Sequence, residues 1–510
     1  MRLRFFAAAL LVLAACSKDD RPSSVPTTAT APPNIVLIVV DTLRADHADS
    51  ALGRAAMPNL ERLARDGVRF ERAFSHVPMT LPSHVSLFSS RYPLDSGVRL
   101  NGQRVGGELP MFSGWLAQHG YRSQAVVSLA TLWPLEKGAS IDRGFADFAY
   151  DAEIDCTPAE RVNAELATLL DGPKSGPLFL FAHYSDPHDP YSAHGSANHT
   201  VEVLFDGKPV QSVSISEVGF LRAPLRLPSG RRALELRGTT PFRIRMLEVR
   251  SMSALMPTEF NDGALHRDLP HASIDVSNSG GAALECELWL WLEDALTSAE
   301  SAARYRLECE YADREIGLFL DDLARRGLYD SSLIVLTSDH GEALGEHGHV
   351  GHVVDVYDES LRVPLIIKVP RGSPARARLE GVKHVTARLI DVVPTMLDLA
   401  GLPELPGQAG ASLLSKSSRV VFAETHAPLA PRTQVALRDE RFKLIFEPQA
   451  ETFAMFDLAE DPGETRDVFS ARGAERIEWQ AKLRDLGRRA LATQAAPDPA
   501  ALRALNALGY

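Results

Sequence analysis

The sequence predicts an α/β fold in which helices cover both faces of a mainly parallel sheet. Two observations predict it. Continuous apolar runs rich in β-branched residues alternate along the chain with helical patterns, as buried parallel strands alternate with their crossover helices. Polar clusters also follow directly after these apolar runs. Ligands of open α/β sheets bind at the carboxyl ends of the strands, so these clusters are the candidate site.

Each expected element can be placed on the chain. The segments that carry a predicted strand are residues 33–47, 177–191 and 331–342 and the run VPLIIKVP from Val363. The helical patterns between them lie at residues 57–68, 109–121, 160–172 and 311–328. We therefore expect one α/β domain formed by two stretches of chain, 34–194 and 293–400.

Two regions depart from this alternation. Residues 195–292 show a period of two between apolar and polar side chains, and Asp206-Gly207 is a hairpin signal, so a β-rich insertion is expected there. Residues 401–510 contain two strand-like stretches and an amphipathic helical pattern at 474–494. They predict a small C-terminal α+β subdomain.

The composition limits the classes of partner. The chain has 510 residues, which is enough for several domains, and its formal net charge is −12. Nucleic-acid backbones attract basic surfaces, so no nucleic-acid partner is expected. The sequence does not predict an oligomeric state.

The N-terminus has the pattern of an export signal. Two arginines in MRLR precede the apolar run FFAAALLVLAAC, which is too short for a membrane-spanning helix. Its end resembles the signal peptide of bacterial lipoproteins, with residues 1–16 removed up to a lipidated Cys16. An ordinary secretory signal is the alternative. Residues 17–33 are rich in Pro and Thr and predict a flexible tether, so we expect an exported lipoprotein of the cell envelope with a lipid anchor in the membrane, and Ser17 favours the outer membrane.

The remaining cysteines do not predict a metal cluster. Cys156, Cys286 and Cys309 show no CxxC spacing. In an exported protein two of them could pair, and we expect a disulfide between Cys286 and Cys309.

Three residues at strand ends predict a metal site. Asp41 ends the first predicted strand, and Asp339 and His340 end the third. Asp41 could instead cap the following turn. Two carboxylates and one imidazole suit Zn or Mn better than Ca or Mg, which prefer shells made only of oxygen.

Further histidines follow in two loops. His347, His349 and His352 lie shortly after His340, and solvated loop positions are the alternative for the first two. His188 lies between Pro187 and Pro190, which stiffen its loop. It could be a general acid, an anion contact or, with Asp186 and His352, a ligand of a second metal.

Thr80 is the candidate nucleophile. Pro82 favours the first turn of a helix that continues through Ser90, which puts Thr80 at the helix N-terminus. Free N–H groups and the helix dipole attract an anion there. Metal coordination would lower the pKa of the Thr80 hydroxyl, whereas a simple helix N-cap is the alternative.

Seven collinear motifs resemble the bacterial sulfatase family of the alkaline-phosphatase superfamily. They cover about residues 34–193 and 300–470 and are NIVLIVVDTLRADH, the stretch from MPNLERLARDGV to SSRYP, GVRLNG, SDPHDPY, SDHGEALGEHG, LRVPLII and DVVPTMLDLAGLP. The resemblance implies the alkaline-phosphatase/sulfatase-like three-layer sandwich around a mostly parallel sheet. It also implies a sulfate- or phosphate-ester substrate.

The resemblance assigns roles to the candidate residues. Asp41, Asp339, His340 and Thr80 would bind the metal, with Thr80 also the nucleophile. His188 and His352 would contact the transferred anion or protonate the leaving group. Asn101 and His84 would contact the substrate.

Two departures from the family pattern bear on the chemistry. Sulfatases carry Cys or Ser in a C/S-x-P-x-R motif that is converted to formylglycine, whereas here Thr80 and His84 take the first and last positions. No formylglycine is therefore expected. Sulfatases also have an Asp-Asp pair where this chain has Asp41-Thr42.

The sequence thus predicts a metal-dependent hydrolase of sulfate or phosphate esters that acts by in-line attack of metal-bound Thr80. Threonine nucleophiles occur in phosphodiesterases and headgroup transferases of the superfamily, so the chemistry leans towards phosphate mono- and diesters. The alternatives are a phospho-headgroup transferase acting on envelope lipid or glycan, and a non-catalytic protein that binds glycan.

Overall fold

The structure is a computed structural model that describes residues 32–493 with gaps at 135, 152–155, 173–175, 190, 192–199, 215–218, 252–257, 261–267, 295–296, 416–418 and 428–431. The predicted signal peptide with Cys16 and nearly all of the predicted tether lie outside the described residues.

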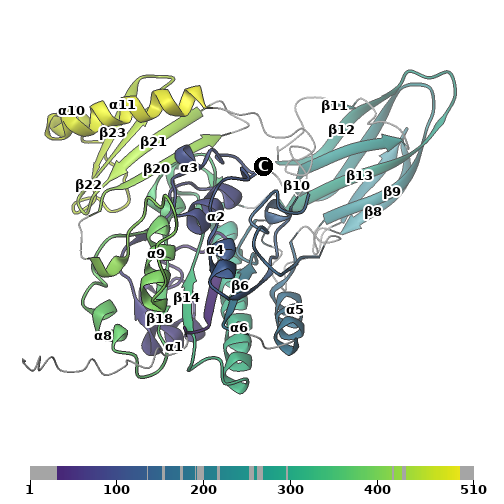
Figure 1. Cartoon of the computed structure of the whole chain (residues 1–510). Helices are drawn as coiled ribbons and strands as arrows, with labels where there is room; N and C mark the ends of the chain where they lie inside the picture. The colour runs from purple at the N-terminus through teal and green to yellow at the C-terminus, as the bar shows by residue number, and fades with distance from the viewer. Residues whose placement is uncertain are drawn as a thin grey trace, which may run out of the picture. The chain divides into compact units, whose positions relative to one another are not determined.

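A seven-stranded sheet forms the centre of the α/β domain, in the order β2-β18-β14-β1-β6-β4-β5 (Figure 1). In that order the strands are Val68–Arg69, Leu365–Lys368, Leu333–Thr337, Ile35–Val40, Leu178–Tyr184, Arg122–Val126 and Asp147–Ala149. The strands from β14 to β5 are parallel to their neighbours. β18 runs antiparallel to both of its neighbours, β14 and β2, so the predicted strand after Val363 exists but is reversed.

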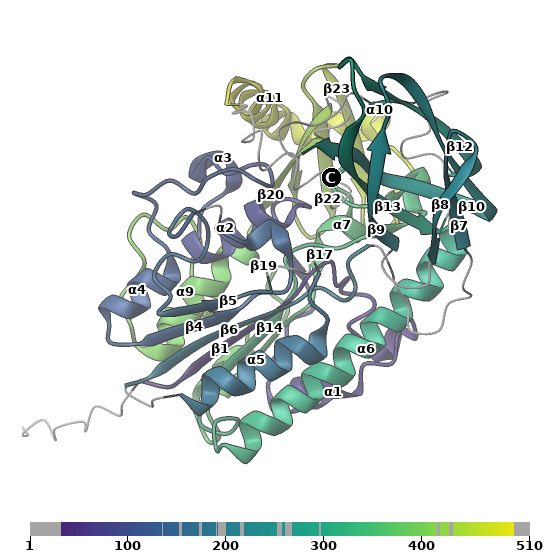
Figure 2. The same cartoon turned by 90° about the vertical axis from the view of Figure 1, so that its right-hand side faces the viewer.

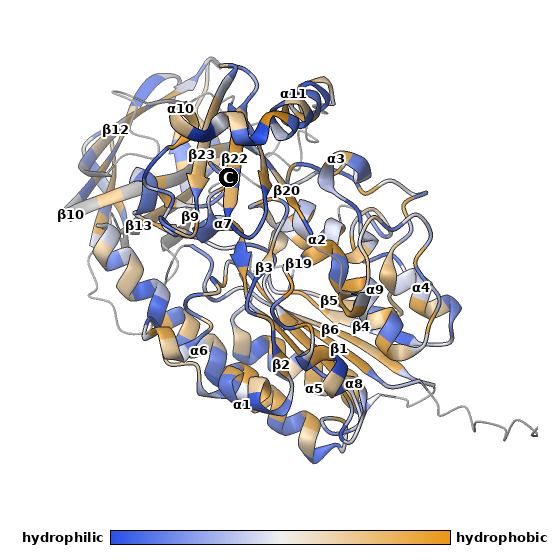
Figure 3. Ribbon diagram, turned by 90° about the vertical axis from the view of Figure 1, so that its left-hand side faces the viewer, coloured by the Kyte–Doolittle hydropathy of each residue, from blue (hydrophilic) through white to orange (hydrophobic). Residues whose placement is uncertain are grey.

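Helices cover both faces of this sheet, as predicted (Figure 2). One face packs against α2 (Thr80–Ser89), α4 (Phe112–Gln118) and α9 (Leu389–Ala400). The other packs against α1 (Pro58–Asp66), α5 (Ala159–Asp171) and α6 (Ser298–Arg325). In Figure 3 the strands of the sheet are mostly orange, whereas the covering helices carry both colours, as expected for strands buried on two faces.

The insertion is an antiparallel sheet with its own core. Its strands are β7 Thr200–Phe205, β8 Lys208–Ser214, β9 Gly219–Leu227, β10 Gly230–Ser251, β11 Thr258–Phe260, β12 Asp268–Asn278 and β13 Leu284–Asp294. Asp206 and Gly207 both have positive φ (47° and 74°) and connect β7 to β8, which confirms the predicted hairpin turn.

The predicted disulfide is wrong. Cys286, in β13, lies in the core of the insertion, whereas Cys309, in α6, is buried among the helices under the central sheet. Both thiols are free. Because the insertion folds around a core of its own, the two cysteines belong to different packing units.

The C-terminal subdomain has the predicted antiparallel sheet and helix. Its strands are β20 Val421–Ala427, β21 Arg432–Arg438, β22 Phe442–Glu447 and β23 Thr452–Asp457. Helix α11 (Ile477–Ala492) packs on this sheet through Leu483, Leu486 and Ala490, rather than on the central sheet.

Shorter elements complete the fold. They are η1 Ser50–Leu52, β3 Ala73–Phe74, α3 Pro93–Ser96, η2 Ala130–Leu132, β15 Ala343–Leu344, η4 Glu346–Gly348, β16 Val350–Gly351, α7 Asp358–Leu361, β17 Arg362–Val363, α8 Ala375–Glu380, β19 Ala387–Arg388, η5 Leu413–Ser415, α10 Phe469–Arg472 and η6 Gly473–Arg476. Within the described ranges, no helix combines the length and apolar character needed to cross a bilayer.

Candidate active site

Three adjacent strands bring polar side chains to one face of the central sheet. Odd-numbered residues of β1 and β6 face the core under α2, as Val39 and Phe181 show. The same alternation places Asp41 and His183 on that face, and Asp339 follows β14 on the other side of β1. All three side chains are completely buried.

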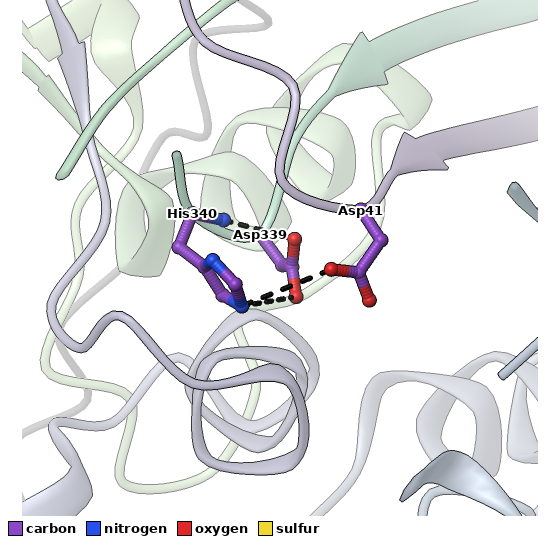
Figure 4. A group of neighbouring side chains, drawn as sticks. All are labelled: Asp41, Asp339 and His340. Carbon is purple, nitrogen blue, oxygen red and sulfur yellow. Dashed lines mark hydrogen bonds and ion pairs between the residues drawn. The ribbon is translucent and has the colours of Figure 1, made fainter. Parts of the chain in front are cut away.

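Asp41, Asp339 and His340 form a compact group of potential metal ligands. One ligand atom from each lies within 4.8 Å of the others. Nε2 of His340 is 3.4 Å from Oδ2 of Asp339 and 3.8 Å from Oδ1 of Asp41 (Figure 4). The predicted strand-end residues therefore converge.

The hydrogen bonds around this group leave its inner atoms unsatisfied. Nδ1 of His340 donates to the carbonyl of Gly341 (3.0 Å), so Nε2 presents a lone pair to the carboxylates. Oδ1 of Asp339 accepts from the backbone N–H of His340 (2.9 Å) and of Thr42 (3.3 Å). Among the described residues, Oδ2 of Asp339, both oxygens of Asp41 and Nε2 of His340 have no hydrogen-bond partner.

A divalent cation fits this donor set. Buried polar atoms without partners are costly, and here lone pairs face one another. Burial and the neighbouring charge of Asp41 raise the pKa of Asp339 well above its usual value. Burial would also raise the pKa of Asp41, but His183, His188 and His340 outweigh it and hold that pKa low. A cation would balance both carboxylates and accept the His340 lone pair.

Thr42, where sulfatases have a second aspartate, does not add a ligand. Its hydroxyl donates to the carbonyl of Asp41 (2.8 Å). Its φ of 57° is left-handed, and its backbone N–H points to Asp339. Thr42 therefore shapes the turn after β1.

Thr80 is the first residue of α2 and is completely buried. The N-cap is Met79, without a side-chain capping bond, so the N-cap alternative for Thr80 is wrong. The first turn of α2 is fastened to the metal group, since Oγ of Ser83 donates to the carbonyl of Asp339 (2.7 Å). On the other side, the backbone N–H of Leu81 donates to Oδ1 of Asn101 (2.9 Å).

His84 lies one turn further along α2 and is completely buried. Its Nδ1 donates to the carbonyl of Thr80 (2.8 Å) and lies 3.6 Å from Oδ2 of Asp339. Burial, reinforced by the charge of His183, lowers the pKa of His84 to about 3. A neutral imidazole therefore stands where sulfatases have a positive arginine, and the predicted contact between His84 and substrate stays a prediction.

His188 and His352 reach the same site. The ring of His352 is 4.6 Å from that of His340 and 5.1 Å from that of His188, centroid to centroid. Nδ1 of His352 is 3.1 Å from Oε1 of Glu342, and Nδ1 of His188 bonds to the carbonyl of Asp189. The two predicted anion-contacting histidines thus lie beside the metal group.

The other candidates have different surroundings. Nδ1 of His347 is 2.6 Å from Oε1 of Glu359, and Nε2 of His349 is 3.1 Å from Oδ2 of Asp355. Oδ1 of Asp186 accepts from the backbone N–H of Ala159 at the start of α5 (3.0 Å), so this oxygen caps a helix. These three residues are not part of the group around Asp41.

His183 belongs to the site, although the sequence pattern around it predicted no role for this histidine. Its Nε2 is 3.3 Å from Oδ2 of Asp41, and its ring is 5.0 Å from that of His84. The available signal was the alternation of Phe179, Phe181 and His183, which places all three on one face of β6.

Comparisons with known proteins show which family the chain belongs to. A family model described as Sulfatase matches residues 33–402, and one described as N-sulphoglucosamine sulphohydrolase, C-terminal, matches residues 345–489. The N-acetylglucosamine-6-O-sulfatase of Bacteroides thetaiotaomicron is 25% identical over 94% of this chain and 88% of its own length. The choline-sulfatase of Rhizobium meliloti is 25% identical over 86% of this chain and 83% of its own length.

Solved structures show the same fold. A 2-O GAG sulfatase matches with a TM-score of 0.60 at 17% identity, over 92% of this chain and 96% of the other. The phosphonate monoester hydrolase of Agrobacterium radiobacter matches with a TM-score of 0.58 at 20% identity, over 91% and 96%. With its buried Asp-Asp-His group and a family match over most of its length, the chain belongs to the sulfatase family of the alkaline-phosphatase superfamily and is an ester hydrolase.

Proposed function

We propose that this chain is a metal-dependent hydrolase that uses Thr80 as its nucleophile on sulfate or phosphate esters, with a preference for phosphate mono- and diesters or phosphonates. The observation that carries the proposal is the position of Thr80. It starts helix α2, whose first turn is bonded to Asp339 through Ser83. A similar fold in a phosphonate monoester hydrolase supports the phosphorus side of this preference.

Asp41, Asp339, His340 and Thr80 would hold the metal, and Zn or Mn suits their mixed oxygen and nitrogen donors better than Ca. When bound, the metal would lower the pKa of the Thr80 hydroxyl and offset negative charge on the substrate. Threonine is not a formylglycine precursor, so the unmodified side chain is the proposed nucleophile.

The reaction follows from the residues around Thr80. Oγ1 of Thr80 attacks the phosphorus or sulfur, and the bond to the leaving oxygen breaks in line with it. His188 or His352 protonates that oxygen as it leaves, and the proton that the Thr80 hydroxyl gives up passes to solvent, from which the histidine is protonated again. Water then cleaves the Thr80 ester and restores the hydroxyl.

The same surroundings would bind the oxygens of the anion. The N-terminus of α2 carries the positive end of the helix dipole, which favours an anion there. Nδ2 of Asn101 is buried and has no hydrogen-bond partner among the described groups, while its Oδ1 is held by Leu81. This amide N–H is therefore a suitable donor to a non-bridging oxygen.

A substrate panel tests the proposal. The purified protein, loaded with Mn²⁺, Zn²⁺ or Ca²⁺, is assayed on an aryl sulfate, an N-acetylglucosamine 6-sulfate, choline sulfate, a phosphate monoester, a phosphate diester and a phosphonate monoester. Turnover of phosphorus esters with Mn²⁺ or Zn²⁺ and an unmodified Thr80 by mass spectrometry are expected. Turnover of sulfates alone would contradict the preference for phosphorus esters, and an oxidised residue at position 80 would contradict unmodified Thr80 as the nucleophile.

We also propose that the chain is exported and anchored by lipid at Cys16, on the pattern of its first residues. Mass spectrometry of the protein from membranes should find a mature N-terminus at a lipidated Cys16. An intact N-terminus, or cleavage without lipid, would contradict the anchor.

A further inference from the structure

We propose that His183 is a positioning residue of the metal centre, which donates its Nε2 proton to Oδ2 of Asp41 and so presents Oδ1 to the metal. The inference rests on the proposed metal centre. It adds a residue that lies outside the motifs that connect the chain to its family.

The strand register brings the two side chains together. β6 lies next to β1 in parallel, with His183 opposite Val39, and the backbone N–H of Asp41 donates to the carbonyl of Tyr184 (2.8 Å). His183 and Asp41 therefore leave neighbouring strands on the same face, at the same end of the sheet. Both are completely buried, so water does not compete for their contact.

The two oxygens of Asp41 have different neighbours. Oδ2 is 3.3 Å from Nε2 of His183, and Oδ1 is 3.8 Å from Nε2 of His340. Within the described part of the chain, neither Nε2 of His183 nor Oδ2 of Asp41 has a hydrogen-bond partner, so each atom is available to the other. One side of the carboxylate thus faces the ligand group, and the other side faces an imidazole.

The other nitrogen of His183 fixes the position of the proton. The backbone N–H of Ser128, which can only donate, points to Nδ1 at 3.4 Å. Oγ of Ser128 is also 2.9 Å from Nδ1 but donates its proton to Oγ of Ser185, so the backbone N–H is the contact that assigns the tautomer. Nδ1 is therefore an acceptor, and a neutral ring carries its proton on Nε2. Ser128 is itself buried and held by Ser185, whose Oγ is 2.9 Å away, so the ring has little freedom to turn.

This arrangement favours positioning over direct coordination. The ligand atoms that lie within 4.8 Å of one another belong to Asp41, Asp339 and His340, and His183 is not among them. A protonated Nε2 also has no lone pair for a metal. The Thr42 hydroxyl cannot orient the Asp41 carboxylate in place of His183, because it donates to the backbone carbonyl of Asp41. Partners of this kind typically change metal affinity by about 10- to 100-fold when they are removed.

Two amide variants test the proposal. The side-chain amide of glutamine reaches the depth of Nε2 and can still donate to Asp41, whereas that of asparagine reaches only the depth of Nδ1. His183→Asn should weaken binding of Mn²⁺ and Zn²⁺ by about 10- to 100-fold in chelator competition, without changing the stoichiometry at saturation. His183→Gln should bind close to wild type, and thermal unfolding of both variants checks the fold.

Other outcomes would overturn the inference. If both variants bind as wild type, His183 only fills space. If both lose affinity and the visible spectrum of the Co²⁺-loaded protein shifts as for a lost nitrogen ligand, His183 coordinates the metal directly.

The tautomer can be measured in the metal-free wild type, which does not depend on how the variants fold. Nitrogen-15 shifts of His183, assigned by comparison with His183→Gln, should show a proton on Nε2. A proton on Nδ1 would overturn the inference even if the wild type binds no metal, in which case the proposed function fails separately.

Discussion

Two groups of carboxylates inside this molecule differ in how their negative charge is balanced. In the C-terminal cluster, the half-buried Asp358 and the buried Glu464 lie beside the buried Lys443 and Arg438. Nζ of Lys443 is 3.0 Å from Asp358 and 2.9 Å from Glu464, and Arg438 is 3.1 Å from Asp358. Among the described residues, the groups paired with Asp41 and Asp339 are the imidazoles of His84, His183 and His340.

In each group one carboxyl has a lowered pKa and one a raised pKa, but the neighbours that set them differ. Burial raises the pKa of Glu464 to about 7 although Lys443 opposes it, and the pKa of Asp41 is held low beside Asp339. Burial would raise the pKa of Asp358, but Arg438 and Lys443 outweigh it and hold that pKa low. Burial raises the pKa of Asp339, and the nearby Asp41 raises it further. The C-terminal cluster contains its own cations and is complete as a folding unit, whereas the metal group is arranged for a cation from outside.

The largest effect is expected at the metal group, from Thr80→Ala. Removing the hydroxyl takes away the nucleophile but leaves Asp41, Asp339 and His340 as metal ligands, so turnover should fall by about 10⁴-fold or more while metal is still bound at saturating concentration. Steady-state kinetics and metal analysis measure the two. Thr80→Ser is the matched control and should keep part of the activity. Undiminished turnover by the alanine variant would remove Thr80 as nucleophile.

The C-terminal cluster should show its effect on stability instead. Lys443→Met leaves the two carboxylates with one cation, and should lower the free energy of unfolding by about 3–5 kcal/mol in urea titrations. Metal affinity should not change. Lys383→Met is the control, because the ion pair of Lys383 with Glu380 is exposed and contributes about 0–1 kcal/mol. Equal effects of both variants would contradict the buried-cluster account.

Asp339→Asn should separate the metal-free and metal-loaded states. Without metal, the variant relieves the repulsion between two buried carboxylates, so the free energy of unfolding should rise by about 1–3 kcal/mol. With metal, it loses a ligand and should no longer be stabilised by added Mn²⁺ or Zn²⁺. Urea titrations with EDTA and with metal make the comparison. If Asp339→Asn is less stable than the wild type both with EDTA and with added metal, the carboxylates of Asp41 and Asp339 do not need a bound cation.

Much of the fold could be predicted from the sequence, because its strands are continuous apolar runs and its helices are amphipathic. The direction of β18 could not, since a short buried run reads the same in either direction. The site was predicted where it depends on strand ends, as for Asp41 and Asp339. The role of His183 could not be predicted, because it depends on β6 lying next to β1. The order of strands in a sheet cannot be inferred from the sequence pattern of a single strand.

The smallest effect is expected from His347, which links the loop after the metal group to the C-terminal cluster. Its Nδ1 contacts Glu359 and its Nε2 is 3.2 Å from the carbonyl of Glu464. Both partners are acceptors, so both bonds require the protonated ring. Burial would lower the pKa of His347, but the bond to Glu359 and its charge, with smaller contributions from Glu464 and Asp355, raise it.

A raised pKa in the folded state means that protonation stabilises the fold, and the sign follows from linkage. The contribution of His347 should be fully present below its unfolded pKa, near 6.5, and should be lost as the pH rises through the higher folded value. Because the ring is partly exposed, the effect should be below about 1 kcal/mol. Unfolding of the wild type and of His347→Gln from pH 5 to 9 measures it, with His384→Gln as the control for an exposed pair with Glu71. A difference between wild type and His347→Gln that does not shrink with rising pH would mean that the neutral ring holds this contact.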